Sequence, residues 1–113
     1  MSRDFVALVR NQPDVNTVIE GMLAYGAELE LRETPSGTIQ LYDPAGLLLV
    51  SVEAPALVEV PGEAERLLGL SVEPPMWWVE VRSSADLPEA VRVARKLVDD
   101  LVRRQGGVVW SST

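Results

Sequence analysis

Residues 76–110 read MWWVEVRSSADLPEAVRVARKLVDDLVRRQGGVVW, and the pattern of this stretch decides the fold. Residues 76–82 carry apolar side chains at alternate positions, which predicts a strand. From Asp86 the sequence resembles a capping box with proline in the first turn, and apolar residues recur at helical spacing as far as Gly106 and Gly107. Residues 108–110 resume as a strand. This order predicts a β-α-β unit whose two strands run parallel.

Working outward, a short apolar run at residues 4–9 predicts a buried strand, and a helix is expected over residues 14–25. Asn11 or Asp14 can cap the start of this helix, and Gly26 is placed to end it. The helix is amphipathic because its apolar residues recur at i, i+3, i+4, i+7 and i+8. These residues are Val15, Val18, Ile19, Met22 and Leu23.

Three further strands are predicted from alternating polarity and turn sequences, at residues 28–33, 38–42 and 47–53. The first two should pair as a hairpin, whereas the third is apolar on both faces at its start and is therefore expected to be central. Residues 54–61 hold a short extended segment between prolines, and residues 62–68 predict a brief helix. Residues 70–75 form a connector, which is the candidate hinge of the chain.

Together these elements predict one α+β domain over residues 1–113. A chain of 113 residues with 47% hydrophobic content is long enough to bury one core. The expected architecture is a two-layer sandwich: a mostly antiparallel sheet of roughly five or six strands, with the helices on one face and the β-α-β unit at the C-terminal end.

The composition excludes several classes of function. The chain has no cysteine and no histidine, which removes the disulfide, the thiolate nucleophile, the commonest neutral-pH base and nearly every transition-metal site. A net charge of −7 would repel the phosphate backbone of nucleic acid. No apolar run approaches the roughly 20 residues that cross a bilayer, so no membrane insertion is expected. The first residues lack a signal-peptide pattern, and a cytoplasmic location is the default expectation.

No catalytic, metal-binding or cofactor-binding site is predicted. The carboxylate pairs that invite attention do not converge, because adjacent residues on a helix point about 100° apart and an acidic strand face is typical of any hairpin exposed to water. These pairs are Asp99 with Asp100, Glu28 with Glu30, and Glu63 with Glu65. The glycines do not form a phosphate-binding loop, and we expect no enzyme activity. A carboxylate-dependent enzyme is a third and less favoured class.

The tryptophans carry the strongest functional signal. Trp77 and Trp78 are neighbours in one strand, so their side chains must point to opposite faces of the sheet. Trp77 is expected under the helices, which leaves Trp78 on an open face. The same alternation predicts an apolar interface on that face, made of Tyr42, Leu47, Leu49, Met76 and Trp78. The alternative is that the loop at residues 54–61 or the short helix at residues 62–68 folds across this face.

Residues 50–55, 60–69 and 106–110 resemble uncharacterised actinobacterial proteins, some of which accompany type VII secretion loci. The resemblance covers about half of the chain and carries no catalytic motif, so it implies a secretion-associated accessory role. In the order of its elements the chain is also similar to dimeric secretion chaperones and to the YbjN-like family. The final β-α-β unit departs from the chaperone order, in which two successive strands precede the last helix.

The sequence therefore predicts a non-enzymatic protein-interaction module, with a protein partner or a second copy of the chain as a homodimer. A secretion-associated accessory or chaperone-like role is the narrower expectation. The alternative is a small-molecule-sensing domain of the ferredoxin-like kind that binds its ligand at a subunit interface. A pocket lined by backbone donors near Gly62 or Gly69 would favour the alternative, whereas a broad apolar face would favour a protein partner.

Overall fold

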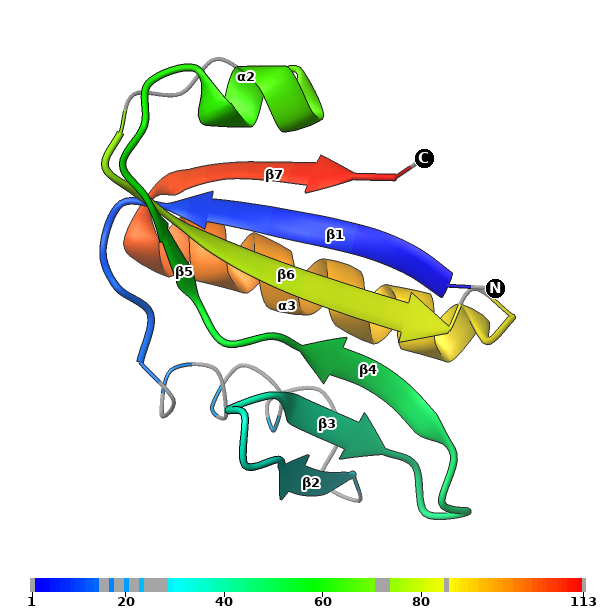
Figure 1. Ribbon diagram of the computed structural model, residues 1–113. Coiled ribbons are helices and arrows are strands. Elements are labelled where there is room, and N and C mark those ends of the chain that lie inside the picture. Colours follow the sequence, from blue (N-terminus) through cyan, green and yellow to red (C-terminus); the bar gives the residue numbers. More distant parts are fainter. Residues whose placement is uncertain are drawn as a thin grey trace.

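The computed structural model describes residues 2–14, 17, 20, 23, 29–70, 74–84 and 86–112. Its strands form one sheet, and a long helix packs across one face of that sheet (Figure 1). The elements are β1 (Ser2–Val9), β2 (Glu30–Glu33), β3 (Ile39–Tyr42), β4 (Leu48–Val52), β5 (Ala56–Val58), α2 (Glu63–Leu68), β6 (Met76–Ser84), α3 (Pro88–Gln105) and β7 (Gly107–Ser111). The predicted α+β class is confirmed, with a seven-stranded sheet.

The sheet has the order β2-β3-β4-β6-β1-β7, and every strand pairing in it is antiparallel. β6 and β7 both pair with β1, so they run parallel to each other with β1 between them. The predicted β-α-β unit is thus present, but its two strands are not neighbours. β4 and β5 lie one after the other along the remaining edge of β6. The break between β4 and β5 ends at Pro55, which has no N–H to donate to a ladder.

The main core lies between the sheet and α3, and the alternation of β1 shows how it is built. Phe5, Ala7 and Val9 point towards α3, where they meet an apolar stripe of that helix. Each large side chain buried here stabilises the fold by about 1.5–3 kcal/mol relative to exposure. The buried residues of α3 that form the stripe are Ala90, Val93, Ala94, Leu97, Val98 and Leu101. Trp77 packs against this core, as predicted.

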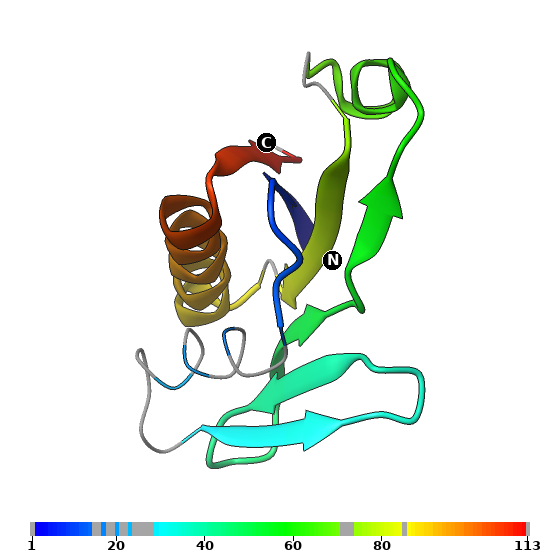
Figure 2. The same cartoon turned by 90° about the vertical axis from the view of Figure 1, so that its left-hand side faces the viewer.

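The short helix α2 does not lie with α3. Its Leu68 packs against a second buried cluster of Val6, Leu8 and Met76, and Figure 2 shows α2 and α3 on opposite sides of the sheet. The expectation that all helices share one face is therefore wrong for α2. The reason is that β1 has neighbouring strands on both edges and is apolar on both faces, so its second face also needs cover.

The ends of α3 differ slightly from the prediction. Its N-cap is Leu87, one residue after Asp86, and Leu87 makes no side-chain cap hydrogen bond, whereas Pro88 occupies the first turn as predicted. At the other end Gly107 has φ 147°, and a Cβ built there would lie 1.8 Å from the carbonyl oxygen of Leu8. Only glycine fits where α3 turns directly into β7.

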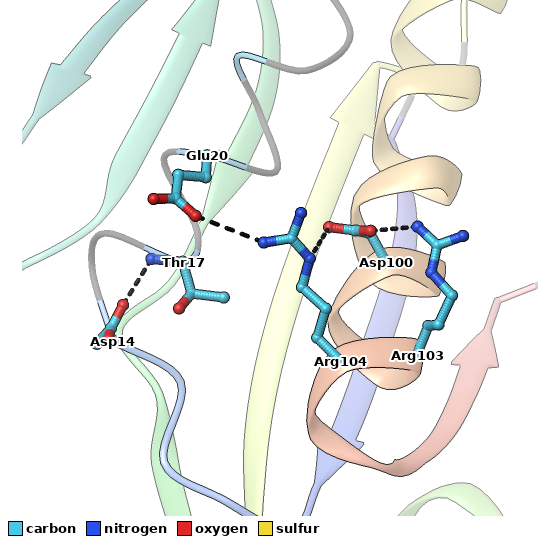
Figure 3. Close-up of polar contacts among 6 residues, drawn as sticks. All are labelled: Asp14, Thr17, Glu20, Asp100, Arg103 and Arg104. Carbon is cyan, nitrogen blue, oxygen red and sulfur yellow. Dashed lines mark hydrogen bonds and ion pairs between the residues drawn. The ribbon is translucent and has the colours of Figure 1, made fainter.

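Parts of the predicted helix over residues 14–25 lie outside the described residues, among them Val15, Val18, Ile19, Met22 and Gly26. The described residues Thr17, Glu20 and Leu23 are helical. Asp14 accepts a hydrogen bond from the backbone N–H of Thr17 at 2.5 Å through its Oδ1 atom, so the prediction that Asp14 can cap this segment is confirmed (Figure 3).

An ion pair of Arg104 with Glu20 joins this segment to α3, and the same arginine binds a buried carboxylate of the helix. Asp100 is 5% exposed, and its Oδ1 and Oδ2 atoms accept from Arg103 Nη2 at 2.5 Å and from Arg104 Nε at 3.0 Å. Arg104 also reaches Glu20 Oε2 at 3.5 Å (Figure 3). Asp100 therefore pairs with two arginines of its own helix, at i+3 and i+4, and these charged hydrogen bonds stabilise the last turns of α3.

Among the described residues, no helix combines the length and the apolar character needed to cross a membrane.

Candidate binding surface

The face of the sheet opposite α3, called here the open face, is crossed by a row of polar residues. Cross-strand register pairs Arg32 with Gln40, Gln40 with Ser51, Ser51 with Arg82, and Arg82 with Asp4. Residues directly opposite each other on neighbouring strands point to the same face. These five residues, called here the polar row, therefore extend from the edge strand β2 to β1.

The charged side chains of the polar row form ion pairs with neighbouring residues of the sheet. Arg82 Nε lies 3.1 Å from Asp4 Oδ1, and Arg82 Nη2 lies 3.6 Å from Glu80 Oε1. The hydrogen bond and the charge of Asp4 raise the pKa of Arg82 above its ordinary value. Both effects hold Arg82 in its charged form, so this side chain can bind a polar group but cannot exchange a proton near neutral pH.

The β2 end of the polar row is built in the same way. Arg32 Nε lies 3.2 Å from Glu30 Oε1, and this hydrogen bond raises the pKa of Arg32. The Arg32 guanidinium also lies 4.6 Å from the centre of the Tyr42 ring, and the Tyr42 hydroxyl donates to Gln40 Oε1 at 3.0 Å. This end of the open face is therefore a fixed surface of mixed charge around one tyrosine.

On the side of the polar row away from Tyr42, the open face becomes apolar. Trp78 lies opposite Leu8, Leu8 lies opposite Val108, and Trp110 lies opposite Val6. Val6, Leu8 and Met76 are buried there, whereas Trp78 and Trp110 keep part of their surface exposed. Leu68 and Leu70 cover this corner only in part.

The apolar corner continues onto large hydrophobic side chains that are exposed. Leu67 of α2 is 52% exposed, and Val60, which precedes α2, and Val108 of β7 are exposed as well. We call the set formed by Val60, Leu67, Trp78, Val108 and Trp110 the α2–β7 surface. Charged residues next to it include Glu59, Glu63, Glu65 and Arg66, of which Glu63 and Arg66 form an ion pair at 2.9 Å. An apolar surface beside charged residues is typical of a protein contact site.

The residues predicted for the interface do not come together. Met76 and Trp78 lie on the open face as predicted, but Met76 is buried by the chain itself. Tyr42 is also on this face, although the polar row separates it from Trp78. Leu47 is 53% exposed and precedes β4. The alternative, in which the short helix folds over the Trp78 region, therefore describes Met76 correctly and the rest of the surface only in part.

The prediction for Leu49 is wrong. Leu49 is 3% exposed and belongs to the main core together with its neighbour Val50. The register between β3 and β4 shifts at Leu41 and Tyr42, so that Leu41 faces Val50 but Tyr42 faces Leu48. A β-bulge of this kind places two successive residues on one side of the sheet and reverses the alternation before it. Leu48 thus takes the place on the open face that simple alternation assigns to Leu49.

Sequence reasoning missed four members of the α2–β7 surface: Val60, Leu67, Val108 and Trp110. Period-two alternation of residues 108–110 shows that Val108 and Trp110 share a face, but it does not show which strand lies beside them. That information is in the position of β7 next to β1, which is a long-range pairing. A tryptophan in a strand without charged residues was the available signal.

The members of the carboxylate pairs lie in different surroundings. Asp100 is held by arginines, Asp99 is exposed, and Glu28 lies outside the described residues. Among the residues that the structure describes, no group of three or more histidine, cysteine, aspartate or glutamate side chains could hold a metal ion.

Two open hollows lie away from Gly62 and Gly69. One of about 240 Å³ is on α3, between Glu89 and Lys96, and one of about 250 Å³ is beside Ser51 and Arg82. Comparison of the chain with protein-family models, with curated proteins and with solved structures found no significant match.

Proposed function

We propose that the protein is a non-enzymatic protein-interaction module that binds through the α2–β7 surface. The observation that carries the proposal is the exposure of Leu67 and Val108 beside two partly exposed tryptophans, Trp78 and Trp110. The main core on the other face is closed by a long helix, whereas α2 is six residues long and leaves this corner partly uncovered.

The arrangement also favours tight contact with a protein. Trp78 and Trp110 pack against Val6 and Leu8, so their side chains lose little conformational entropy when a partner covers them. Partly buried aromatic anchors of this kind commonly contribute most of the energy of an interface. The polar row next to them offers paired charges, which would contribute to specificity more than to affinity.

The small-molecule alternative finds less support. Gly62 and Gly69 stand at the two ends of α2, and a Cβ added at either would meet no atom within 4 Å. Among the described residues, nothing therefore closes over the backbone at these glycines to enclose a ligand.

Selection from a random-peptide display library tests the proposal. Peptides selected on the wild-type chain are expected to lose binding to Leu67→Glu and to keep binding to Leu47→Glu. The two leucines form a matched pair because they are 52% and 53% exposed, on opposite sides of the polar row. A selection that yields no binders, or binders equally sensitive to both variants, would overturn the proposal.

The narrower proposal is a secretion-associated accessory or chaperone-like role, which the sequence resemblance implies. Such a role requires the α2–β7 surface to bind apolar segments of an unfolded client. We expect the wild-type chain to slow the aggregation of a client polypeptide followed by light scattering, and Leu67→Glu to slow it less. Equal effects of the two chains would contradict the narrower proposal and leave the general one in place.

A further inference from the structure

The strands at the two ends of the strand order, β2 and β7, differ in how they are protected. The edge strand β2 reads ELRE and carries three charged residues in four positions. The opposite edge strand β7 reads GVVWS and carries none, in a chain of which 24% is charged. Natural sheets protect an exposed edge with charges, prolines or bulges, because an unprotected strand pairs with another chain. β2 has this protection and β7 lacks it.

The backbone of β7 is oriented for such a pairing. The backbone N–H of Arg10 donates to the carbonyl of Gly106 at 3.1 Å, and the backbone N–H of Ser112 donates to the carbonyl of Asp4 at 2.9 Å. In an antiparallel ladder alternate residues exchange their hydrogen bonds with the neighbouring strand. Val108 and Trp110 therefore direct their backbone groups to β1, whereas Gly107 and Val109 direct theirs to the outer edge. Among the described residues, β7 pairs with β1 alone.

The sequence of β7 is self-complementary about Val109. If two copies of the strand pair antiparallel around a two-fold axis at this residue, the two Val109 backbones exchange both of their hydrogen bonds. Val108 of each copy then lies opposite Trp110 of the other copy, on the open face. Because β7 carries no charge, two chains with a net charge of −7 can meet here without placing like charges opposite each other.

We infer that β7 joins two copies of this chain by antiparallel sheet extension centred on Val109. The inference rests on the proposed function in that it names a second copy as a partner of the α2–β7 surface, to which Val108 and Trp110 belong. The contact extends the sheet through β7 of each copy. Figure 2 shows α2 displaced from β7 towards the open face.

Mass measurement in solution tests the inference. By analytical ultracentrifugation the wild type is expected to dimerise at twice its mass of 12.4 kDa. Val109→Pro removes one outward N–H and is expected to weaken dimerisation at least about 100-fold while the chain stays folded, since proline is tolerated at a strand edge. Folding is checked by circular dichroism and tryptophan fluorescence.

Leu31→Pro is the matched control. The backbone N–H of Thr34 donates to the carbonyl of Thr38, and because alternate residues bond to β3, Leu31 directs its backbone groups away from β3 to the outer edge. Leu31 and Val109 also both pack against the main core. This variant should remain dimeric. If Val109→Pro does not fold, Val108→Glu replaces it, because this change leaves the backbone intact and places two carboxylates in the contact.

A wild type that stays monomeric at several hundred micromolar would overturn the inference. A Val109→Pro variant that dimerises as tightly as the wild type would overturn it as well, and dissociation of that dimer by Leu67→Glu would place the contact on α2. Either result is separate from the proposed function. Displayed peptides that depend on Leu67 would still support a binding module that does not pair through β7. A dimer sensitive to Val109→Pro but without such peptides would support the sheet extension alone.

Discussion

Replacing Leu49 and Leu48 separately by alanine gives a sharp comparison, because the two neighbours lie on opposite faces of β4. Leu49 is 3% exposed in the main core, and Leu48 is 41% exposed on the open face. A leucine removed from a closed core costs about 2–5 kcal/mol, through lost burial and the cavity that remains. We expect Leu49→Ala to lower the free energy of unfolding by about 3 kcal/mol and Leu48→Ala by less than about 1 kcal/mol.

Urea unfolding followed by tryptophan fluorescence measures both variants. With a slope of about 1.5 kcal/mol per molar urea, the midpoint of Leu49→Ala should fall by about 2 M and that of Leu48→Ala by less than about 0.7 M. Simple alternation along residues 47–53 without a bulge predicts the reverse order. Equal losses, or a larger loss for Leu48→Ala, would refute the register shift and the reasoning built on it.

Gly107→Ala should unfold the chain or detach β7 in a thermal melt, because its Cβ would meet the carbonyl oxygen of Leu8, whereas Gly46→Ala, with open space around it, should cost only about 1 kcal/mol. Comparable melting temperatures for the two variants would contradict the close approach of β7 to β1. Asp100→Ala should lower the free energy of unfolding by about 1–3 kcal/mol through the loss of charged hydrogen bonds, while Asp99→Ala, at an exposed position, should change it by less than about 0.5 kcal/mol. Equal effects in chemical denaturation would show that the two arginine pairs of Asp100 do not stabilise the fold. Hydrolase, transferase and phosphatase screens should stay at background, and turnover abolished by Glu80→Gln would contradict a non-enzymatic role.

The local elements could be predicted from the sequence because the spacing of apolar residues differs between a helix and a strand. The helix at Pro88–Gln105 and the hairpin of β2 and β3 follow from spacing and turn residues alone. The opposite placement of Trp77 and Trp78 is confirmed for the same reason, since neighbours in a strand must diverge.

The features that sequence reasoning missed depend on long-range pairing. β1 lies between β6 and β7, and only this position makes its second face buried and draws α2 away from α3. The shift at Leu41 and Tyr42 comes from the fit between two strands, so no pattern within β4 reveals it. Asp100 differs from these features, because its two arginines stand at i+3 and i+4 on its own helix, and only its burial depends on the packing of α3.

We propose that the chain contacts its partner through the corner of α2 and β7. Residue-resolved amide hydrogen exchange, compared between its associated and dissociated states, tests this most directly. We predict that association slows exchange at Val109 and in residues 60–70, while β2, β3 and the outer side of α3 keep their rates. Slowing confined to α3 or to the β2–β3 hairpin, or the same rates in both states, would contradict the claim.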